Sequence, residues 1–327
     1  MNQSKARITA IGSYVPEKVM TNEDFAQIVD TNDEWIVSRT GIKERRVAVE
    51  NEFTSDLGYK AVLNLVERYN RSIDDVDMII VCTFTPDVAT PSSAAIIQAK
   101  LNLRHTGTLD INAACAGFTY GIHMANALIT SGLHKKILVI GSETLSKITD
   151  YEDRTTCILF GDGAGAVLVE YDDEQSSFLA HHMGSEGEKS KNLYCTGISN
   201  QLFGEELNHK QTIVQNGREV YRWAVTTVPE GVQTILNGIN FPIDNVDWFV
   251  PHSANLRMIE SICERTGISL SKTLYSLVNY GNTSSATIPL ALDMAVKDGR
   301  IKQGDHILLY GFGGGLTHCG QLIKWTL

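Results

Sequence analysis

The sequence has no excess of basic residues. It contains 28 Lys and Arg against 38 Asp and Glu, which gives a formal net charge of −10 at pH 7. Non-specific binding of nucleic acid needs a basic surface, so this balance argues against a nucleic-acid partner. It leaves room for an acidic protein partner that binds a local basic patch.

Long apolar runs are also missing. Runs such as residues 78–82 and 307–310 are far shorter than the ~20 residues that cross a bilayer. Residues 1–19 lack the apolar core of a secretory signal. We therefore predict a cytoplasmic protein that makes no contact with a membrane.

The cysteines lack the spacing of a metal site. None of the six belongs to a C-x-x-C pair or follows zinc-finger spacing, so we predict no metal. Their wide spread in a chain of this length indicates reduced thiols rather than a disulfide framework. They are Cys82, Cys115, Cys157, Cys195, Cys263 and Cys319.

What the chain does contain is an internal duplication. Its 327 residues correspond to about two domains of ~150 residues each. Residues 73–77 read IDDVD and residues 243–247 read IDNVD, and a strand-like apolar run follows each pentapeptide. The elements that follow each pentapeptide then come in the same order.

Each copy continues with a helix, a strand, a small-residue turn that opens a long helix, another strand and a glycine-rich turn. Alternation of this kind predicts parallel sheets covered by helices. Two copies predict a duplicated α/β/α/β/α sandwich with pseudo-twofold symmetry. The paired ranges are 92–101 with 255–266, 108–111 with 273–278, 114–117 with 281–284, and 136–140 with 306–310.

The polar stretch 172–177 lies between the two copies and is the predicted boundary. The N-terminal half is then residues 1–174 and the C-terminal half residues 175–327. Residues 184–217 are rich in Gly, Ser, Asn and Lys, so we interpret them as an irregular insertion rather than a core element.

Cys115 is the candidate nucleophile. It lies in AACAGFTYG between a predicted strand and a predicted helix. The positive end of a helix macrodipole favours a thiolate, and a thiolate can attack a thioester and hold its acyl group. The sequence alone also allows a small buried core cysteine at this position.

His252 and Asn282 are candidate partners of Cys115. His252 follows a predicted strand in FVPHSANLR, where α/β proteins place ligands, and Asn282 lies in the turn equivalent to that of Cys115. A pseudo-twofold axis would bring these strand ends together. The duplication therefore predicts one pocket that holds all three side chains.

Two glycine-rich runs have different interpretations. Gly311 to Gly315 can present backbone N–H groups to an oxyanion. The run from Gly161 to Gly165 resembles a dinucleotide motif, but a strand-like stretch follows where that motif requires a helix. We therefore expect no dinucleotide there.

Several motifs together resemble the beta-ketoacyl-[acyl-carrier-protein] synthase III family of thiolase-like enzymes. They occur in order along nearly the whole chain: TNDEWIVSRTGIKERR from Thr31, AACAGFTYG, FGDGAGA, VPHSANLR, NYGNTSSATIP and GFGGG. This resemblance implies the thiolase fold, a homodimer and no cofactor. Its substrates would be an acyl-CoA primer and malonyl-acyl carrier protein (malonyl-ACP).

The resemblance also implies a mechanism. Cys115 would be acylated by acyl-CoA, and His252 and Asn282 would stabilise the enolate formed when malonyl-ACP loses CO2. The enolate would attack the acyl-cysteine and release 3-oxoacyl-ACP. The backbone N–H groups of Cys115 and Gly314 would form the oxyanion hole.

Binding roles follow from the same resemblance. Trp35 and Arg154 would sandwich the adenine of coenzyme A, an arrangement that stacking and cation–π attraction favour. The coenzyme A channel would be lined by Thr31, Arg39 and Asn255. Arg222 and Arg257 match the basic positions at which the family docks the carrier protein.

The sequence departs from the family pattern at two positions. Ser253 follows the histidine where glutamine is frequent, which leaves the Cys-His-Asn trio intact. Thr90 stands where the family often has a phenylalanine that reaches across the dimer into the primer pocket. The smaller side chain leaves the primer open between acetyl and larger acyl groups.

Other functions remain open at this point. Elongating synthases pair cysteine with two histidines, and thiolases use a second cysteine, so Asn282 fits neither. A relative that makes a specialised metabolite by the same chemistry is the main alternative. A papain-like protease shares the Cys-His-Asn order but lacks its C-G-[SA]-C-[WY] signature here. A non-catalytic acyl-binding protein would not need the intact trio.

Overall fold

The computed structural model describes residues 3–175, 177–208 and 210–327. Within these residues one five-stranded sheet has the order β1-β7-β6-β4-β5. β4 runs parallel to β5 and β6, whereas β7 runs antiparallel to its neighbours β1 and β6. The bounds are β1 (Ala6–Tyr14), β4 (Met78–Cys82), β5 (Gly107–Ile111), β6 (Lys136–Thr144) and β7 (Asp162–Tyr171).

A second, four-stranded sheet in the described part of the chain repeats this order as β8-β15-β14-β13. β13 runs parallel to β14, and β15 runs antiparallel to both β14 and β8. The first sheet is built from residues on the N-terminal side of the polar stretch 172–177, and the second from residues after it. The bounds are β8 (Phe178–Ser185), β13 (Trp248–Pro251), β14 (His306–Gly313) and β15 (Thr317–Lys324).

The prediction of a strand over residues 273–278 was wrong. Thr273 alone forms a bridge, with Phe249, at the sheet position that β5 occupies in the first copy. Beyond it, the Ser276 N–H donates to the Ser253 hydroxyl, and helix α8 (Leu277–Tyr280) begins. The Ser276 N–H is therefore not available to pair with β13, and the pairing ends at Thr273.

The repeated pentapeptide has a structural cause in its last aspartate. Asp77 N–H donates to the Lys136 carbonyl, and Asp77 Oδ2 accepts from the N–H groups of Lys135 and Lys136. Asp247 N–H donates to the His306 carbonyl, and its Oδ2 accepts from the His306 N–H. In each copy the aspartate ties the start of one strand to the start of its parallel neighbour.

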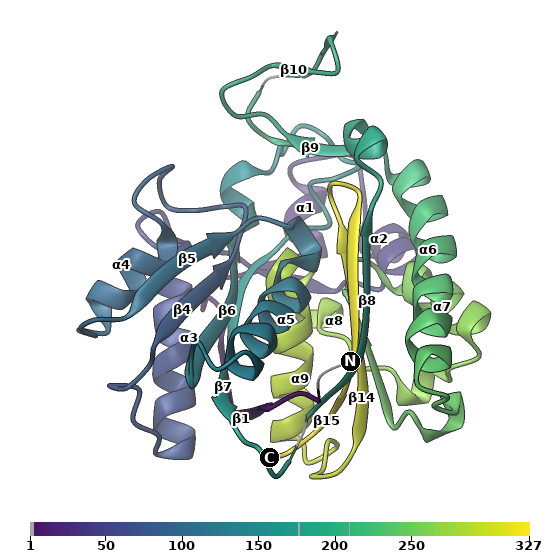
Figure 1. The fold of residues 1–327 in the computed structure, drawn as a ribbon. Helices are drawn as coiled ribbons and strands as arrows, with labels where there is room; N and C mark the ends of the chain where they lie inside the picture. Colours follow the sequence, from purple (N-terminus) through teal and green to yellow (C-terminus); the bar gives the residue numbers. More distant parts are fainter. Residues whose placement is uncertain (1–2, 176, 209) are drawn as a thin grey trace.

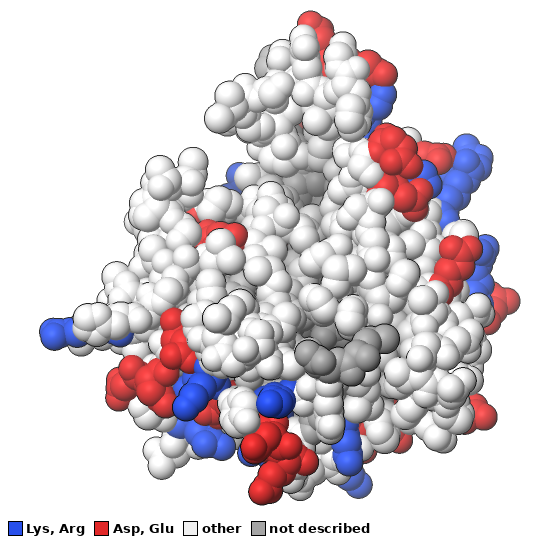
Figure 2. Space-filling model, viewed as in Figure 1, with Lys and Arg blue, Asp and Glu red and all other residues white. Residues whose placement is uncertain are grey.

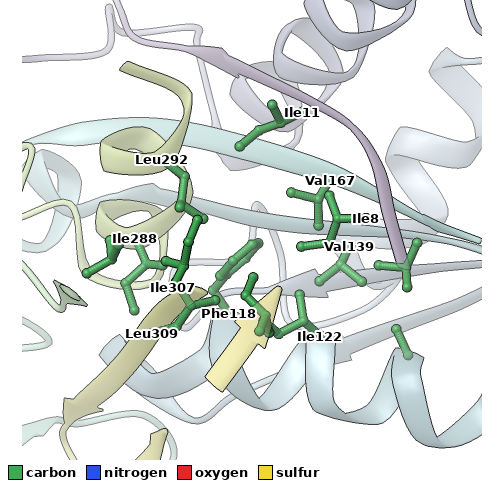
Figure 3. Packing of buried hydrophobic residues seen from close by; sticks show 14 of the residues in the cluster. Ile8, Ile11, Phe118, Ile122, Val139, Val167, Ile288, Leu292, Ile307 and Leu309 are labelled. Atoms are coloured by element: carbon green, nitrogen blue, oxygen red, sulfur yellow. The ribbon is translucent and has the colours of Figure 1, made fainter. Parts of the chain in front are cut away.

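Two helices lie between the sheets. Helices α5 (Gly117–Thr130) and α9 (Thr287–Lys297) occupy the middle of the molecule in Figure 1. Figure 3 shows how their apolar side chains meet those of both sheets in one buried cluster. The labelled residues are Phe118 and Ile122 of α5, Ile288 and Leu292 of α9, Ile8, Ile11, Val139 and Val167 of the first sheet, and Ile307 and Leu309 of the second.

The outer faces of the sheets are covered by further helices. α3 (Thr54–Tyr69) and α4 (Ser93–Lys100) pack on the first sheet, and α6 (Gly217–Gly238) packs on the second together with α7 (Leu256–Thr266). The layers are therefore helix, sheet, helix, sheet and helix, as the duplication predicted. This architecture is the thiolase fold.

Several short elements also lie between β1 and β4 in the chain. They are α1 (Asn22–Ala26), α2 (Asp33–Thr40) and the hairpin of β2 (Val19–Thr21) with β3 (Glu44–Arg46). After β8, the insertion predicted over residues 184–217 contains a 3₁₀ helix, Gly187–Asn192, and short strand pairs. In it β9 (Leu193–Cys195) pairs with β12 (Ile213–Gln215), and β10 (Gln201–Leu202) pairs with β11 (Glu205–Glu206) in the projection at the top of Figure 1.

No helix in the described ranges has the length and apolar character needed to cross a bilayer. The strand-like stretch predicted after the Gly161 to Gly165 run is also present, since β7 includes most of that run. A Cβ on Gly165 would lie 2.5 Å from Pro289 Cβ, so glycine here allows α9 to approach the sheet. The run therefore serves packing in a strand, not a dinucleotide turn.

Candidate active site

Cys115, His252 and Asn282 line one cavity of about 800 Å³, as the duplication predicted. Cys115 lies in a 3₁₀ turn, Ala114–Ala116, that leads directly into α5. His252 follows β13, and Asn282 follows α8. Apolar residues form much of the remaining wall, among them Phe84, Ile111, Leu145, Phe160, Leu193, Ile213 and Phe312.

The turns that carry Cys115 and Asn282 have the same backbone shape. Ala114 and Ser284 adopt positive φ angles of 44° and 50° at the first positions of equivalent 3₁₀ turns, Ala114–Ala116 and Ser284–Ala286. Non-glycine residues seldom adopt this conformation, and it persists where surrounding packing enforces it. Both halves thus retain the same strained turn at the cavity.

Cys115 is 8% exposed, and its burial raises the pKa of its thiol to about 12. The nearby Ser284 hydroxyl acts in the opposite direction, and so does the N-terminus of α5. The sequence had indicated a thiolate stabilised by the helix alone. Burial opposes that effect, so the resting thiol is protonated and needs an acceptor for its proton.

His252 is held in place from both sides. Its backbone N–H donates to the Tyr310 carbonyl, and its Nδ1 lies 2.8 Å from Thr287 Oγ1. The imidazole meets the Phe312 ring edge-on, with 5.3 Å between centroids. Burial lowers the pKa of His252 to about 3, so the ring is neutral and Nε2 is the nitrogen left for a ligand.

Thr287 controls which ring nitrogen of His252 carries the hydrogen. Thr287 Oγ1 lies 2.9 Å from the Ser284 carbonyl as well as near His252 Nδ1, and the hydroxyl has a single proton. When that proton goes to Nδ1, the neutral ring carries its hydrogen on Nε2 and can donate into the cavity. When it goes to Ser284, Nε2 is an acceptor.

Asn282 is fixed by its backbone and by its side chain. Its N–H donates to the Leu159 carbonyl, and its own carbonyl accepts from the Gly161 N–H. Its Oδ1 accepts from the Ser284 N–H at 2.8 Å. Because the oxygen is engaged, the amide NH2 is the group that can donate to a ligand in the cavity.

The glycine-rich run at the end of β14 lies against Cys115. A Cβ on Gly313 would come within 2.8 Å of Cys115 Cβ and 3.0 Å of Cys115 Sγ. A Cβ on Gly314 would lie 3.4 Å from Ala114 Cβ. Glycine lets the backbone pass this close to the thiol, and Gly313, Gly314 and Gly315 all line the cavity.

A second group of predicted residues gathers around Trp35 on α2. The Arg39 and Arg154 guanidinium carbons lie 5.1 and 5.4 Å from the Trp35 ring centroid. Arg154 Nη1 also donates to the Asp30 carbonyl at 2.9 Å. Thr31 precedes Asn32, the N-cap residue of α2. These residues do not belong to the wall that the described residues form around the cavity.

Arg257 and Asn255 lie at the start of α7, next to α2. Asn255 Oδ1 accepts from the Met258 N–H and caps the helix. Arg257 Nε donates to the Ser38 carbonyl, which joins the two helices. Arg222 is exposed on α6 and pairs with Glu219 at 2.9 Å.

Comparison with known proteins identifies the family. The family patterns described as 3-oxoacyl-[acyl-carrier-protein (ACP)] synthase III and its C-terminal part match residues 109–187 and 236–325. The chain is 67% identical over 327 residues to beta-ketoacyl-[acyl-carrier-protein] synthase III 2 of Halalkalibacterium halodurans, covering 100% of this chain and 98% of the relative. The chain belongs to the beta-ketoacyl-[acyl-carrier-protein] synthase III family. It is therefore an acyltransferase of the condensing type.

Further relatives agree with this assignment. The Bacillus subtilis synthase III 2 is 58% identical over 324 residues, covering 99% of this chain and all of that protein. The solved synthase III of Thermus thermophilus superimposes with a TM-score of 0.94 at 43% identity, covering 98% and 99% of the two chains. A priming beta-ketosynthase from the R1128 polyketide pathway has a TM-score of 0.92 at 31% identity, covering 99% and 97%.

Four features of this synthase site were missed in the sequence. Glu143, Ser284 and Thr287 are buried around the trio, and the insertion wall from Leu193 to Gly197 closes one side of the cavity. Glu143 stands near the end of the apolar run KILVIGSET, and a charged residue in that place could have drawn attention to it. Ser284 and Thr287 are ordinary residues of a helix start, and no local pattern distinguishes them.

Thr90 is not in the cavity wall of this chain. It is exposed, after β4, whereas Phe84 of the same connection lines the cavity. Phe84 therefore borders the cavity within this chain, and Thr90 does not.

Proposed function

We propose that this synthase starts fatty acid synthesis of the type II kind. An acyl-CoA primer acylates Cys115 and releases CoA, and decarboxylative Claisen condensation with malonyl-ACP then gives 3-oxoacyl-ACP and CO2. The observation that carries this proposal is the arrangement of Cys115, His252 and Asn282 around one cavity beside the glycine-rich turn.

Each group of the site has a role that its environment supports. The N–H groups of Cys115 and Gly314 stabilise the oxyanion of the tetrahedral intermediates. His252 Nε2–H and the Asn282 NH2 donate to the thioester oxygen as the malonyl group becomes an enolate. This role needs a neutral imidazole, which the burial of His252 supplies.

The cluster around Trp35 is the proposed site for coenzyme A. An adenine ring can stack on Trp35 and under the Arg154 guanidinium, and Thr31, Arg39 and Asn255 border the way to the cavity. Arg39 and Arg154 already lie over the indole ring, which supports a site for a flat, electron-rich group.

We further propose a cytoplasmic homodimer that needs no cofactor, with halves that divide between residues 174 and 175. The edge strand β5 and the helix α5 face the viewer in Figure 1, and Figure 2 shows few charges across the middle of this face. An edge strand on a face poor in charge favours pairing with a second copy.

A second candidate function has one observation in its favour. The priming beta-ketosynthase of a polyketide pathway matches almost the whole chain. The same two half-reactions would then supply a specialised pathway. The identity of the preferred carrier protein distinguishes the two.

The proposal is tested by mass spectrometry of the protein after incubation with a panel of acyl-CoAs. We expect one acyl group per chain, on the peptide that contains Cys115. Prior acylation should also protect Cys115 from iodoacetamide. An acyl group found elsewhere, or no protection, contradicts the mechanism.

Charge reversal at Arg222 should weaken use of malonyl-ACP but not of acyl-CoA. The carrier protein is acidic and this chain is net negative, so docking depends on local basic residues. We expect Arg222→Glu to raise KM for malonyl-ACP about 2- to 10-fold, more at low salt. Arg257→Glu should act likewise, and Arg265→Glu, at the far end of α7, is the control. Equal damage to Cys115 acylation would instead indicate a role in folding or coenzyme A binding.

Primer choice should respond to the size of residue 90. A threonine in place of phenylalanine leaves room for a branched acyl group of four or five carbons, provided that Thr90 borders the pocket of a partner chain. One methylene is worth about 1–3 kcal/mol, or 10- to 200-fold in rate. We expect isobutyryl-, isovaleryl- or 2-methylbutyryl-CoA to match or exceed acetyl-CoA, and Thr90→Phe to favour acetyl. If Thr90→Phe leaves the ratio of the branched-chain to the acetyl-CoA rate unchanged, other residues, such as Phe84, set the choice of primer.

A further inference from the structure

A carboxyl group that the proposed mechanism does not use is buried beside the nucleophile. Glu143 lies on β6 and is 0% exposed. Its Oε2 accepts hydrogen bonds from the hydroxyls of Thr83 and Thr85 at 2.8 and 2.7 Å, and from the N–H groups of Phe84 and Thr85 at 3.2 Å. These four donors hold the carboxyl group in one orientation.

The second oxygen of this carboxyl group is free. Among the described residues, Glu143 Oε1 and Ser284 Oγ are both buried and complete no hydrogen bond. Ser284 Oγ is nevertheless close enough to lower the pKa of both Glu143 and Cys115. Two unpaired polar atoms in a buried site are costly unless they serve a function. The turn Ser284–Ala286 packs against both the Cys115 turn and β6, which carries Glu143, so the Ser284 hydroxyl is placed next to both groups.

Ser284 is held firmly in this position. Its N–H donates to Asn282 Oδ1 at 2.8 Å, and its carbonyl oxygen lies 2.9 Å from Thr287 Oγ1. Its φ of 50° leaves little freedom to the backbone. The hydroxyl is thus the one part of Ser284 that can rotate, which is what transfer of a proton requires.

The thiol of Cys115 needs a proton acceptor, since burial keeps it protonated. His252 is a poor one, because burial lowers the pKa of its ring to about 3. We propose that Glu143 accepts, through the Ser284 hydroxyl, the proton that Cys115 loses on acylation, and returns it after condensation. This inference rests on the function proposed above and adds a residue to it.

The protons balance in both steps. Cys115 S–H gives its proton to Ser284 Oγ as the Ser284 hydroxyl proton passes to Glu143, and the thiolate displaces CoA, which leaves as a thiol after taking a proton from solvent. In condensation, the malonyl carboxylate leaves as CO2, the enolate forms the new C–C bond, and the Cys115–acyl bond breaks. Protonated Glu143 then returns its proton through Ser284 to the Cys115 thiolate.

The acidity of Glu143 suits this role. Burial raises the pKa of Glu143 to about 7, partly offset by its hydrogen bonds. It can thus hold or release a proton near neutral pH. The titratable groups that feel its charge are Cys82 and Cys115, and the pKa of Cys82 is raised far above the neutral range by its own burial. Cys82 therefore stays protonated, and the exchange is between Glu143 and Cys115.

The variant Glu143→Gln separates this proposal from a purely structural role. Glutamine keeps an oxygen for the four donors but cannot accept a proton. If Glu143 acts only through its negative charge, it raises the pKa of the Cys115 thiol, and Glu143→Gln would make the thiol react faster. As a proton acceptor, its removal should slow single-turnover acylation by acetyl-CoA about 100-fold or more and remove the inflection near pH 7.

The matched control is Asp162→Asn on the neighbouring strand β7. Asp162 is equally buried and accepts from Ala48 N–H and the Ser146 hydroxyl, away from the cavity wall. Its acylation rate should be unchanged at a temperature where each variant is folded by circular dichroism. An equal loss in Asp162→Asn would overturn the proposal.

Ser284→Ala supplies a second test that removes only the relay. It should slow acylation as Glu143→Gln does, and a wild-type rate in either variant would overturn the proposal. Alkylation of Cys115 by iodoacetamide is measured in the same variants across pH 6–9. This readout does not depend on coenzyme A. If the wild type fails to react with acyl-CoA, the proposed function is wrong. If alkylation is nevertheless slower in both variants, the role of Glu143 as proton acceptor is supported.

Discussion

His252→Ala is expected to separate the two half-reactions. Decarboxylation of malonyl-ACP should fall about 10²- to 10³-fold, because one of two donors to the enolate oxygen is lost. Acylation of Cys115 should continue, since the neutral His252 ring takes no proton from the thiol. Asn282→Ala should behave in the same way through loss of its amide NH2.

The measurements are CO2 release from malonyl-ACP and the mass of the acyl-enzyme, made on the same preparations. His181→Ala is a suitable control, because His181 lies on β8 and is exposed outside the cavity wall. The division of roles is wrong if His252→Ala abolishes acylation in a folded protein.

Alanine at Gly311 or Gly141 should lower the stability of the fold. A Cβ on Gly311 would lie 2.9 Å from Ala116 Cα, and a Cβ on Gly141 would lie 2.6 Å from the Ser285 carbonyl oxygen. Each glycine thus presses against the backbone turn of one half of the site. Overpacking of this kind typically costs about 1–3 kcal/mol, and rigid backbone partners put these two sites at the upper end.

The two variants should also differ in activity. Gly311→Ala displaces the turn of Cys115 and should slow acylation, whereas Gly141→Ala displaces the turn that follows Asn282 and should slow decarboxylation. Urea unfolding measures stability, and Gly238→Ala is the control because nothing lies within 4 Å of its Cβ position. If Gly311→Ala is as stable as the wild type, the turn that carries Cys115 can move to make room for the methyl group.

Much of this protein can be inferred from sequence because its fold is repeated. The two IDxVD pentapeptides carry aspartates that accept from the same point of a neighbouring strand, so a short match reports a shared architecture. Once the halves are aligned, Cys115, His252 and Asn282 fall at strand ends that must meet. The trio was therefore predictable although its members are far apart in the chain.

The sequence was less informative where a backbone has several possible partners. Residues 273–278 have the composition of a strand, yet only Thr273 pairs, because Ser253 supplies an acceptor from another part of the chain. The sequence predicts an irregular insertion rather than a core element over residues 184–217. Leu193 and Ile213 within it nevertheless form part of the cavity wall.

The sequence by itself determined the duplicated sandwich and the candidate trio of Cys115, His252 and Asn282, since these depend on apolar periodicity and on residues in repeated turns. The tertiary structure alone decided the protonation of the site. A cysteine before a helix predicts a thiolate, but the burial of Cys115 reverses the direction of the pKa shift. The carboxyl of Glu143 becomes a weak acid only because strands distant in sequence exclude water around it, and desolvation depends on everything packed nearby.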